Sequence, residues 1–98
     1  MNFEFHPEAL EEFQNASLWY EEQRYQLGLE FGETIGIAIQ SIMSDPERFQ
    51  PFRDGVRIFR LKRFPYYLFY RISTEGNLIR ILAVTHHRQQ PGYWMQRR

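Results

Sequence analysis

The spacing of apolar residues changes its period at Asp45-Pro46, and this change constrains the fold more than any other feature. From residue 7 to this point, apolar residues recur every three or four positions, which is typical of helices buried along one side. The pattern predicts a first helix over residues 7–24, with Pro7 at its first position, and a second helix over residues 27–44. The second helix is expected to end before Pro46, because proline disfavours helix for the residue that precedes it.

After Pro46 the pattern becomes that of a sheet. Apolar residues alternate with polar ones or run on continuously in three segments, which predict strands over Val56–Arg63, Tyr66–Ile72 and Leu78–Thr85. The third segment is apolar on both faces and is therefore expected inside the sheet. A shift of the apolar phase near Ile58-Phe59 predicts a bulge, and the Gly and Asn of residues 73–77 predict a turn.

The N-terminus adds one more short strand, because Phe3-Glu4-Phe5 alternates before His6-Pro7 interrupts it. The expected fold class is α+β: an N-terminal strand, an antiparallel two-helix hairpin and then a three-stranded antiparallel sheet. No repeat, linker or low-complexity segment divides the 98 residues, so a single domain over residues 1–98 is predicted.

Three glycines stand four residues apart on the second predicted helix, at Gly28, Gly32 and Gly36. Each glycine inside a helix costs about 0.5–1 kcal/mol relative to alanine, so such a strip calls for a physical reason. We expect the first helix to pack closely against it. The alternative is a weak helix whose order depends on a partner.

Several classes of site are excluded or not expected. The chain has no cysteine, so it forms no disulfide, thiolate metal site or cysteine nucleophile. It has no apolar stretch of the roughly 18 residues that a membrane span needs, and no signal peptide is expected. Adjacent His86-His87 would point to opposite faces of an extended strand and could not chelate one ion together. No metal site and no cofactor are therefore predicted.

Charge is divided unevenly along a chain whose formal net charge is zero. Residues 1–50 hold ten acidic and two basic residues, whereas residues 51–98 hold two acidic and ten basic ones. The basic half is suited to a polyanionic or acidic partner. Equally, acidic helices and a basic sheet can balance each other within one fold.

Motifs spread over nearly the whole chain resemble the RelE/ParE toxin superfamily. In order, they are His6-Pro-Glu-Ala-Leu, Asp45-Pro46, Val56-Arg57, Phe64-Pro65-Tyr66-Tyr67, Tyr70-Arg71, Ile81 to Arg88, and Pro91-Gly92-Tyr93-Trp94. The Phe-Pro-Tyr motif and the ending His-x-Arg-x-x-Pro-x-Tyr-Trp are closer to the ParE branch.

The resemblance implies a small cytoplasmic toxin of a type II toxin–antitoxin system, neutralised by a cognate antitoxin protein with which it can form a hetero-oligomer. ParE-like members poison DNA gyrase, and RelE-like members cleave messenger RNA on the ribosome. The ParE-like activity is the expected one here. The alternatives are a ribosome-dependent endoribonuclease and a weakly toxic member that mainly binds its antitoxin.

Candidate site residues come from the basic half. For binding to the target they are Arg57, Arg60, Lys62, Arg63, Arg71, Arg88, Tyr93 and Trp94. If the chain is instead a metal-independent endoribonuclease, the catalytic candidates are Arg60, Lys62, Arg71, His86, His87 and Tyr93, because such chemistry needs an acid, a base and cations on the phosphate. Two purely structural interpretations compete with these functional ones. In the first, His86 and His87 only end the last strand; in the second, Tyr93-Trp94 fills the core. Zero net charge weakens long-range attraction to RNA, so binding without catalysis is favoured over nuclease activity.

Overall fold

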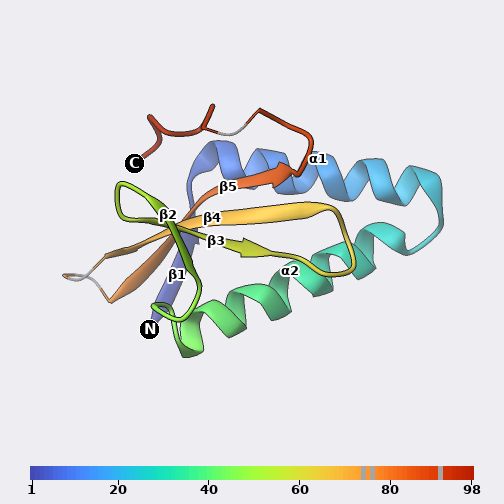
Figure 1. Cartoon of the computed structure of the whole chain (residues 1–98). Coiled ribbons are helices and arrows are strands. Elements are labelled where there is room, and N and C mark those ends of the chain that lie inside the picture. The colour runs from blue at the N-terminus through green and yellow to red at the C-terminus, as the bar shows by residue number, and fades with distance from the viewer. Residues whose placement is uncertain (74, 76, 91) are drawn as a thin grey trace.

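The computed structural model describes residues 1–73, 75, 77–90 and 92–98. Its elements are β1 (Asn2–Phe5), α1 (Pro7–Gln23), α2 (Leu27–Ser44), β2 (Gln50–Arg53), β3 (Val56–Arg60), β4 (Tyr66–Ser73) and β5 (Leu78–His86). The strands form one sheet in the order β1-β5-β4-β3-β2, in which β1 is parallel to β5 and the other pairs are antiparallel. Figure 1 shows the two antiparallel helices and the segment that turns back after β5. We call residues 87–90 and 92–98 the C-terminal segment. The α+β class and the helical hairpin are confirmed.

Both helices begin with contacts that satisfy their free N–H groups. Pro7 occupies the first turn of α1, and His6 Nδ1 accepts a hydrogen bond from Glu8 N at 3.1 Å. At the start of α2, the Glu21 carboxylate accepts hydrogen bonds from Gln26 N and Gly28 N at 2.9 and 3.1 Å. One acidic side chain of α1 therefore caps α2 and fixes the hairpin connection. Neither helix in the described part of the chain is long and apolar enough to cross a membrane.

The glycine strip contacts α1 at one end. A Cβ atom on Gly28 would lie 2.5 Å from the Ser17 carbonyl oxygen, so only glycine allows this approach. At Gly32 the nearest atom, of Phe13, would be 3.7 Å away, and at Gly36 nothing lies within 4 Å. The expectation of a continuous strip is wrong, because residues four apart drift by roughly 40° per step around a helix.

The sheet is buried on both faces. On the face covered by the helices, α2 and the strands form the larger core, which includes Phe31, Ile35, Ile42, Leu68, Ile79 and Ile81. On the opposite face, the C-terminal segment covers a second core of Val56, Ile58, Phe69, Leu82, Ala83 and Trp94. β5 lies between β1 and β4 and contributes to both cores, which explains its continuous apolar run.

Two sequence expectations about the strands are wrong. The structure contains a strand that the sequence did not predict, β2, which pairs with β3. All four residues of β2 are exposed, so the sequence has no apolar alternation that would predict this strand. No bulge occurs at Ile58-Phe59, since β3 pairs with β4 in unbroken register. Register shifts lie instead between Phe69 and Tyr70 in the β4–β5 pair and between Pro51 and Arg53 in the β2–β3 pair. Ile58 faces the second core and Phe59 packs against the first, so two-sided burial produced the phase shift.

The predicted ends of the strands differ from the observed ends by only a few residues. β3 stops at Arg60 rather than Arg63, and β5 continues to His86. The predicted turn over residues 73–77 includes positions 74 and 76, which lie outside the described residues, as does Pro91 of the C-terminal motif. Asn77 has a φ of 49°, the left-handed conformation that asparagine tolerates in turns.

The two ends of the glycine strip should respond oppositely to alanine. Gly28→Ala forces a methyl group against the Ser17 carbonyl and should destabilise the fold by about 1–3 kcal/mol. Gly36→Ala meets open space and should stabilise it by roughly 0.4–1 kcal/mol, because it restricts the unfolded chain. Urea unfolding of both variants measures this difference, and equal midpoints would contradict the close helix approach.

Candidate functional site

Most of the cations expected to bind a target instead hold the chain together. Arg57 donates to the carbonyl oxygens of Glu47 and Phe49, at 3.0 and 2.7 Å. Arg71 donates to Asp54 O and Arg60 to the Gln50 side chain, both at 2.6 Å. These bonds fix β2 and its turns at the sheet edge. Arg63 pairs with Glu30 of α2, which joins the basic half to the acidic half.

Lys62 and Arg88 differ from these arginines. Their charged groups make no hydrogen bond or ion pair with any part of the chain that the structure describes, and both residues are exposed. The β3–β4 loop, which carries Lys62, adjoins the turn that carries Arg88, because His87 N donates to Pro65 O at 2.8 Å. The cations left for a partner in this region thus belong to two adjoining segments at one end of the sheet.

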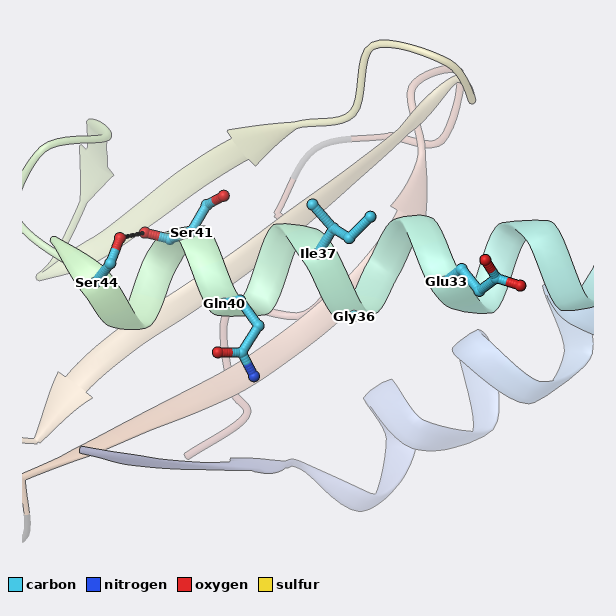
Figure 2. A pocket seen from close by; sticks show the side chains of 6 residues that line it. All are labelled: Glu33, Gly36, Ile37, Gln40, Ser41 and Ser44. Atoms are coloured by element: carbon cyan, nitrogen blue, oxygen red, sulfur yellow. Dashed lines mark hydrogen bonds between the residues drawn. The ribbon is translucent and has the colours of Figure 1, made fainter.

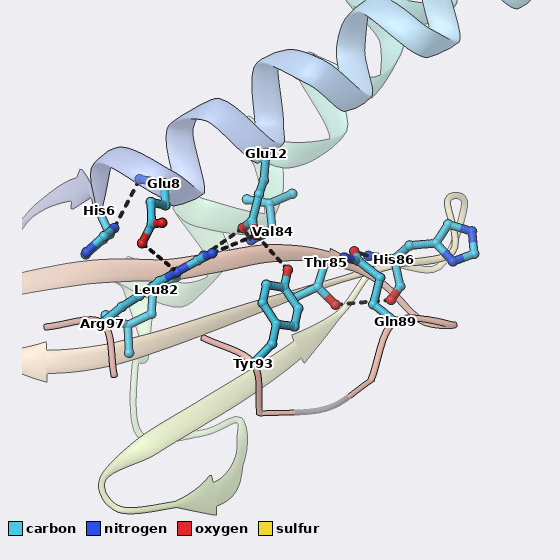
Figure 3. Close-up of polar contacts among 10 residues, drawn as sticks. All are labelled: His6, Glu8, Glu12, Leu82, Val84, Thr85, His86, Gln89, Tyr93 and Arg97. Carbon is cyan, nitrogen blue, oxygen red and sulfur yellow. Dashed lines mark hydrogen bonds and ion pairs between the residues drawn. The ribbon is translucent and has the colours of Figure 1, made fainter. Parts of the chain in front are cut away.

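Glu12 of α1 organises a polar cluster with Glu8, Tyr93 and Arg97, here called the Glu12 cluster (Figure 3). Its carboxylate accepts the Tyr93 hydroxyl at 2.6 Å, two Arg97 nitrogens at 3.0 Å each, and Val84 N at 2.9 Å. Arg97 also pairs with Glu8 at 3.3 Å and donates to Leu82 O at 3.0 Å. These contacts fasten the C-terminal segment to α1 and β5.

Burial and the Glu12 cluster both favour the neutral form of Tyr93. Burial raises the pKa of the Tyr93 phenol, and the hydrogen bond to the Glu12 carboxylate raises it further. A phenol that donates a hydrogen bond to a carboxylate stays neutral at physiological pH and is a poor general base. The geometry therefore gives Tyr93 a fastening role, although the residue stays partly exposed.

Trp94 lies in the core rather than on the surface. Its side chain is fully buried and packs on Phe69 with ring centroids 4.2 Å apart. Trp94 therefore cannot offer its ring to a target while the C-terminal segment stays in place. The interpretation of Trp94 as a core residue fits this position better than the target-binding hypothesis.

His86 and His87 do not point to opposite faces. Their rings stack with centroids 4.7 Å apart and an angle of 25° between their planes, because β5 ends at His86 and the chain turns at His87. His86 Nδ1 accepts a hydrogen bond from Arg88 N at 3.1 Å. Burial, with added repulsion from His87 and Arg88, lowers the pKa of His86 and favours its neutral form. Among the described residues, no group of three or more His, Cys, Asp or Glu is arranged to hold a metal ion.

A hollow of about 420 Å³ opens beside His86, between α1 and the β3–β4 loop. We call it the aromatic pocket; it is lined by Trp19, Tyr20, Pro65, Tyr66 and His86. Burial raises the pKa of both Tyr20 and Tyr66, as it lowers that of His86. Perturbed titratable groups gathered in one concavity are typical of functional sites.

A second hollow of about 310 Å³ continues the aromatic pocket along α1, since both are lined by Trp19 and Tyr66. It reaches Glu12 and Gln89, whose side-chain oxygens accept Val84 N and His86 N. The pocket and the Glu12 cluster are therefore the two ends of one groove. It follows β5 beyond the four residues that pair with β1.

Another hollow, of about 620 Å³, lies along the exposed side of α2 (Figure 2). Gly36 forms part of its floor, and Ile37 is 68% exposed beside it. It holds none of the candidate residues found by sequence analysis. Its one large apolar side chain, Ile37, suits contact with another surface.

Comparison with known proteins identifies the family. The family model described as "ParE toxin of type II toxin-antitoxin system, parDE" matches residues 3–91.

The chain belongs to the ParE toxin family.

The fold agrees with this assignment. In the solved structure described as "Chromosomal ParDE TA system from P. aeruginosa", one chain superimposes with a TM-score of 0.76 at 19% sequence identity. The match covers 88% of this chain and 95% of that one, so the two share the fold. None of the curated proteins compared matches the sequence.

The ParE family match includes the aromatic pocket and both histidines but ends before Tyr93, Trp94 and Arg97. The contacts that fasten Tyr93 and Arg97 to Glu12 are therefore established by this structure and not by the family match. Sequence analysis missed Glu12, Trp19 and Tyr66 as site residues. For Glu12, the available signal was Glu8 four residues earlier on the same helix face, opposite a basic C-terminus.

Removing the Glu12 carboxylate should loosen the C-terminal segment. Glu12→Ala leaves Val84 N–H unpaired and Arg97, whose side chain is 10% exposed, without its bidentate partner. We expect a loss of about 1–3 kcal/mol in the free energy of unfolding. The matched control is Glu11→Ala, an exposed neighbour, with an expected change within about 0.5 kcal/mol. Chemical unfolding of both variants tests this, and equal losses would refute the fastening role.

Proposed function

We propose that this ParE-family chain inhibits DNA gyrase in the cytoplasm by binding it, and that a cognate antitoxin neutralises the chain in a hetero-oligomer. The family assignment supports the toxin role, because the matched family is the toxin of parDE systems. The gyrase target and the neutralisation are our inferences from that assignment and from the site.

One observation carries the choice of binding over catalysis: Tyr93 and two of the three candidate catalytic cations, Arg60 and Arg71, are already engaged within the fold. Tyr93 donates to Glu12, and Arg60 and Arg71 bind oxygens of the chain at 2.6 Å. Metal-independent RNA cleavage needs a free acid, a free base and cations directed at one phosphate. The arrangement supports a surface that binds more than one that cleaves.

Exposed apolar side chains support a protein partner. Tyr25 is 79% exposed, and Leu18, Leu29 and Ile37 are each more than half exposed on the helical hairpin. Large apolar side chains left in water often mark interaction sites, and an amphipathic antitoxin segment would cover them. This also agrees with the high aromatic content of the sequence, 17% of residues.

Two activity assays distinguish the proposal from the nuclease alternative. Purified chain should block DNA supercoiling by purified gyrase, and the antitoxin should restore it. The same preparation should leave ribosome-bound messenger RNA intact. Codon-phased cleavage of that RNA, lost on Tyr93→Phe, would contradict the proposal and favour the ribonuclease.

The cations without internal partners should matter most for inhibition. We expect Lys62→Ala combined with Arg88→Ala to weaken gyrase inhibition by about tenfold or more, since charge pairs at interfaces contribute strongly to binding. Arg48→Ala, a change to another exposed arginine, is the control and should have little effect. Full inhibition by the double variant would show that the target binds elsewhere.

A further inference from the structure

The aromatic pocket combines flat apolar walls with neutral polar groups. Trp19 is 56% exposed and contacts Tyr20 edge-on with centroids 5.2 Å apart, while His86 contacts Tyr66 in the same manner at 5.3 Å. The Tyr20 and Tyr66 hydroxyls are neutral at physiological pH, and burial raises their pKa further above it. Since His86 Nδ1 accepts from Arg88 N, the neutral ring carries its proton on Nε2 and keeps a donor.

Positive charge lies beside this neutral pocket. Arg88 follows His86 by two residues and its N–H donates to His86 Nδ1 at 3.1 Å, and its side chain makes no ion pair within the described chain. Glu12, the acidic residue that lines the groove, is paired with Arg97. Figure 3 shows the His86 ring at the end of β5, directed away from the Glu12 cluster.

We propose that the aromatic pocket binds one unpaired nucleotide, with its base on Trp19 and its phosphate beside Arg88. This site goes beyond the proposed gyrase inhibition and does not depend on it. The same chemistry is offered by a free nucleotide and by a nucleotide of a single strand.

A base suits this lining better than an aliphatic side chain does. An aliphatic side chain brings no hydrogen-bonding group to a pocket lined by two tyrosines and His86, whereas the edge of a base carries both donors and acceptors. The volume of about 420 Å³ lies in the range of small-molecule sites. A paired base of a duplex cannot expose its face to Trp19, so the site selects unpaired nucleotides.

The two tryptophans of the chain make a direct binding assay possible. Trp94 is fully buried, so quenching by a soluble ligand reports on Trp19. Four ligands are titrated into the full chain: adenosine, adenosine 5′-monophosphate, a single-stranded oligonucleotide of about eight nucleotides, and the duplex of the same sequence. We expect quenching by the monophosphate, weaker quenching by adenosine and none by the duplex. Tighter binding of the oligonucleotide than of the monophosphate would assign the site to a strand, and the reverse order to a free nucleotide.

Variants locate the site by fluorescence anisotropy of a labelled oligonucleotide or nucleotide, whichever binds tighter. Trp19→Ala should weaken binding at least about fivefold, the loss expected for one base stack. Tyr25→Ala removes another exposed aromatic residue of the hairpin and should leave affinity unchanged. For a strand, Arg88→Ala should lower the dependence of log K on log salt by about 0.7, the contribution of one phosphate contact. For a free nucleotide, it should abolish the preference for monophosphate over adenosine.

Three outcomes would overturn the proposal. The first is no quenching of Trp19 by any of the four ligands. The second is equal binding of duplex and single strand that Trp19→Ala does not change, which would indicate non-specific attraction to basic residues elsewhere. The third is a shift of Trp19 emission by an acidic phenylalanine-containing peptide but not by nucleotides, which would assign the pocket to a protein partner. Circular dichroism of each variant confirms its fold, and both Trp19 and Arg88 are exposed.

Discussion

The contact between Glu12 and β5 is the interaction on which the rest of this structure depends. β1 pairs with residues Leu78 to Ile81 of β5, and beyond them the strand edge has no neighbouring strand. An unpaired edge exposes N–H and C=O groups and invites wrong pairing. Glu12, Arg97 and Gln89 bind those groups with side chains instead. The same carboxylate thereby joins α1, the sheet and the C-terminal segment.

Fastening the C-terminal segment makes the second core possible. The sheet face opposite the helices is apolar, and Trp94 with its neighbours covers it. A sheet of this size would otherwise leave Phe69 and Leu82 in water, at a cost of about 1.5–3 kcal/mol for each side chain. Polar fastening and apolar burial therefore support each other, because the Glu12 cluster positions the segment that carries Trp94.

Sequence reasoning succeeded where a signal was local and failed where it depended on distant partners. Helical periodicity and Pro46 placed both helices within a residue or two, and the approach of α1 to Gly28 followed from the glycine spacing. β2 has no periodic signal, because it is held at the edge by Arg57 and Arg60 rather than by burial. Glu12 was missed as a site residue, because nothing local in the sequence links it to Arg97, 85 positions later.

The structure pairs many of the unevenly distributed charges with each other. This pairing reduces the number of cations that remain available to bind a partner. Acidic residues of the helices do pair with basic residues of the second half, Glu30 with Arg63 of the β3–β4 loop and Glu12 with Arg97 of the C-terminal segment. Arg57 and Arg71 instead bind backbone carbonyl groups. Each cation used in this way loses its freedom to contact a partner, since a new bond must replace an existing one. Lys62 and Arg88 can contact a partner without breaking a bond, because their charged groups have no hydrogen bond or ion pair within the described chain. Arg88 lies beside the aromatic pocket, so a positive charge and an aromatic surface occur together at one end of the sheet. A ligand bound there can contact both without breaking any bond that holds the fold together.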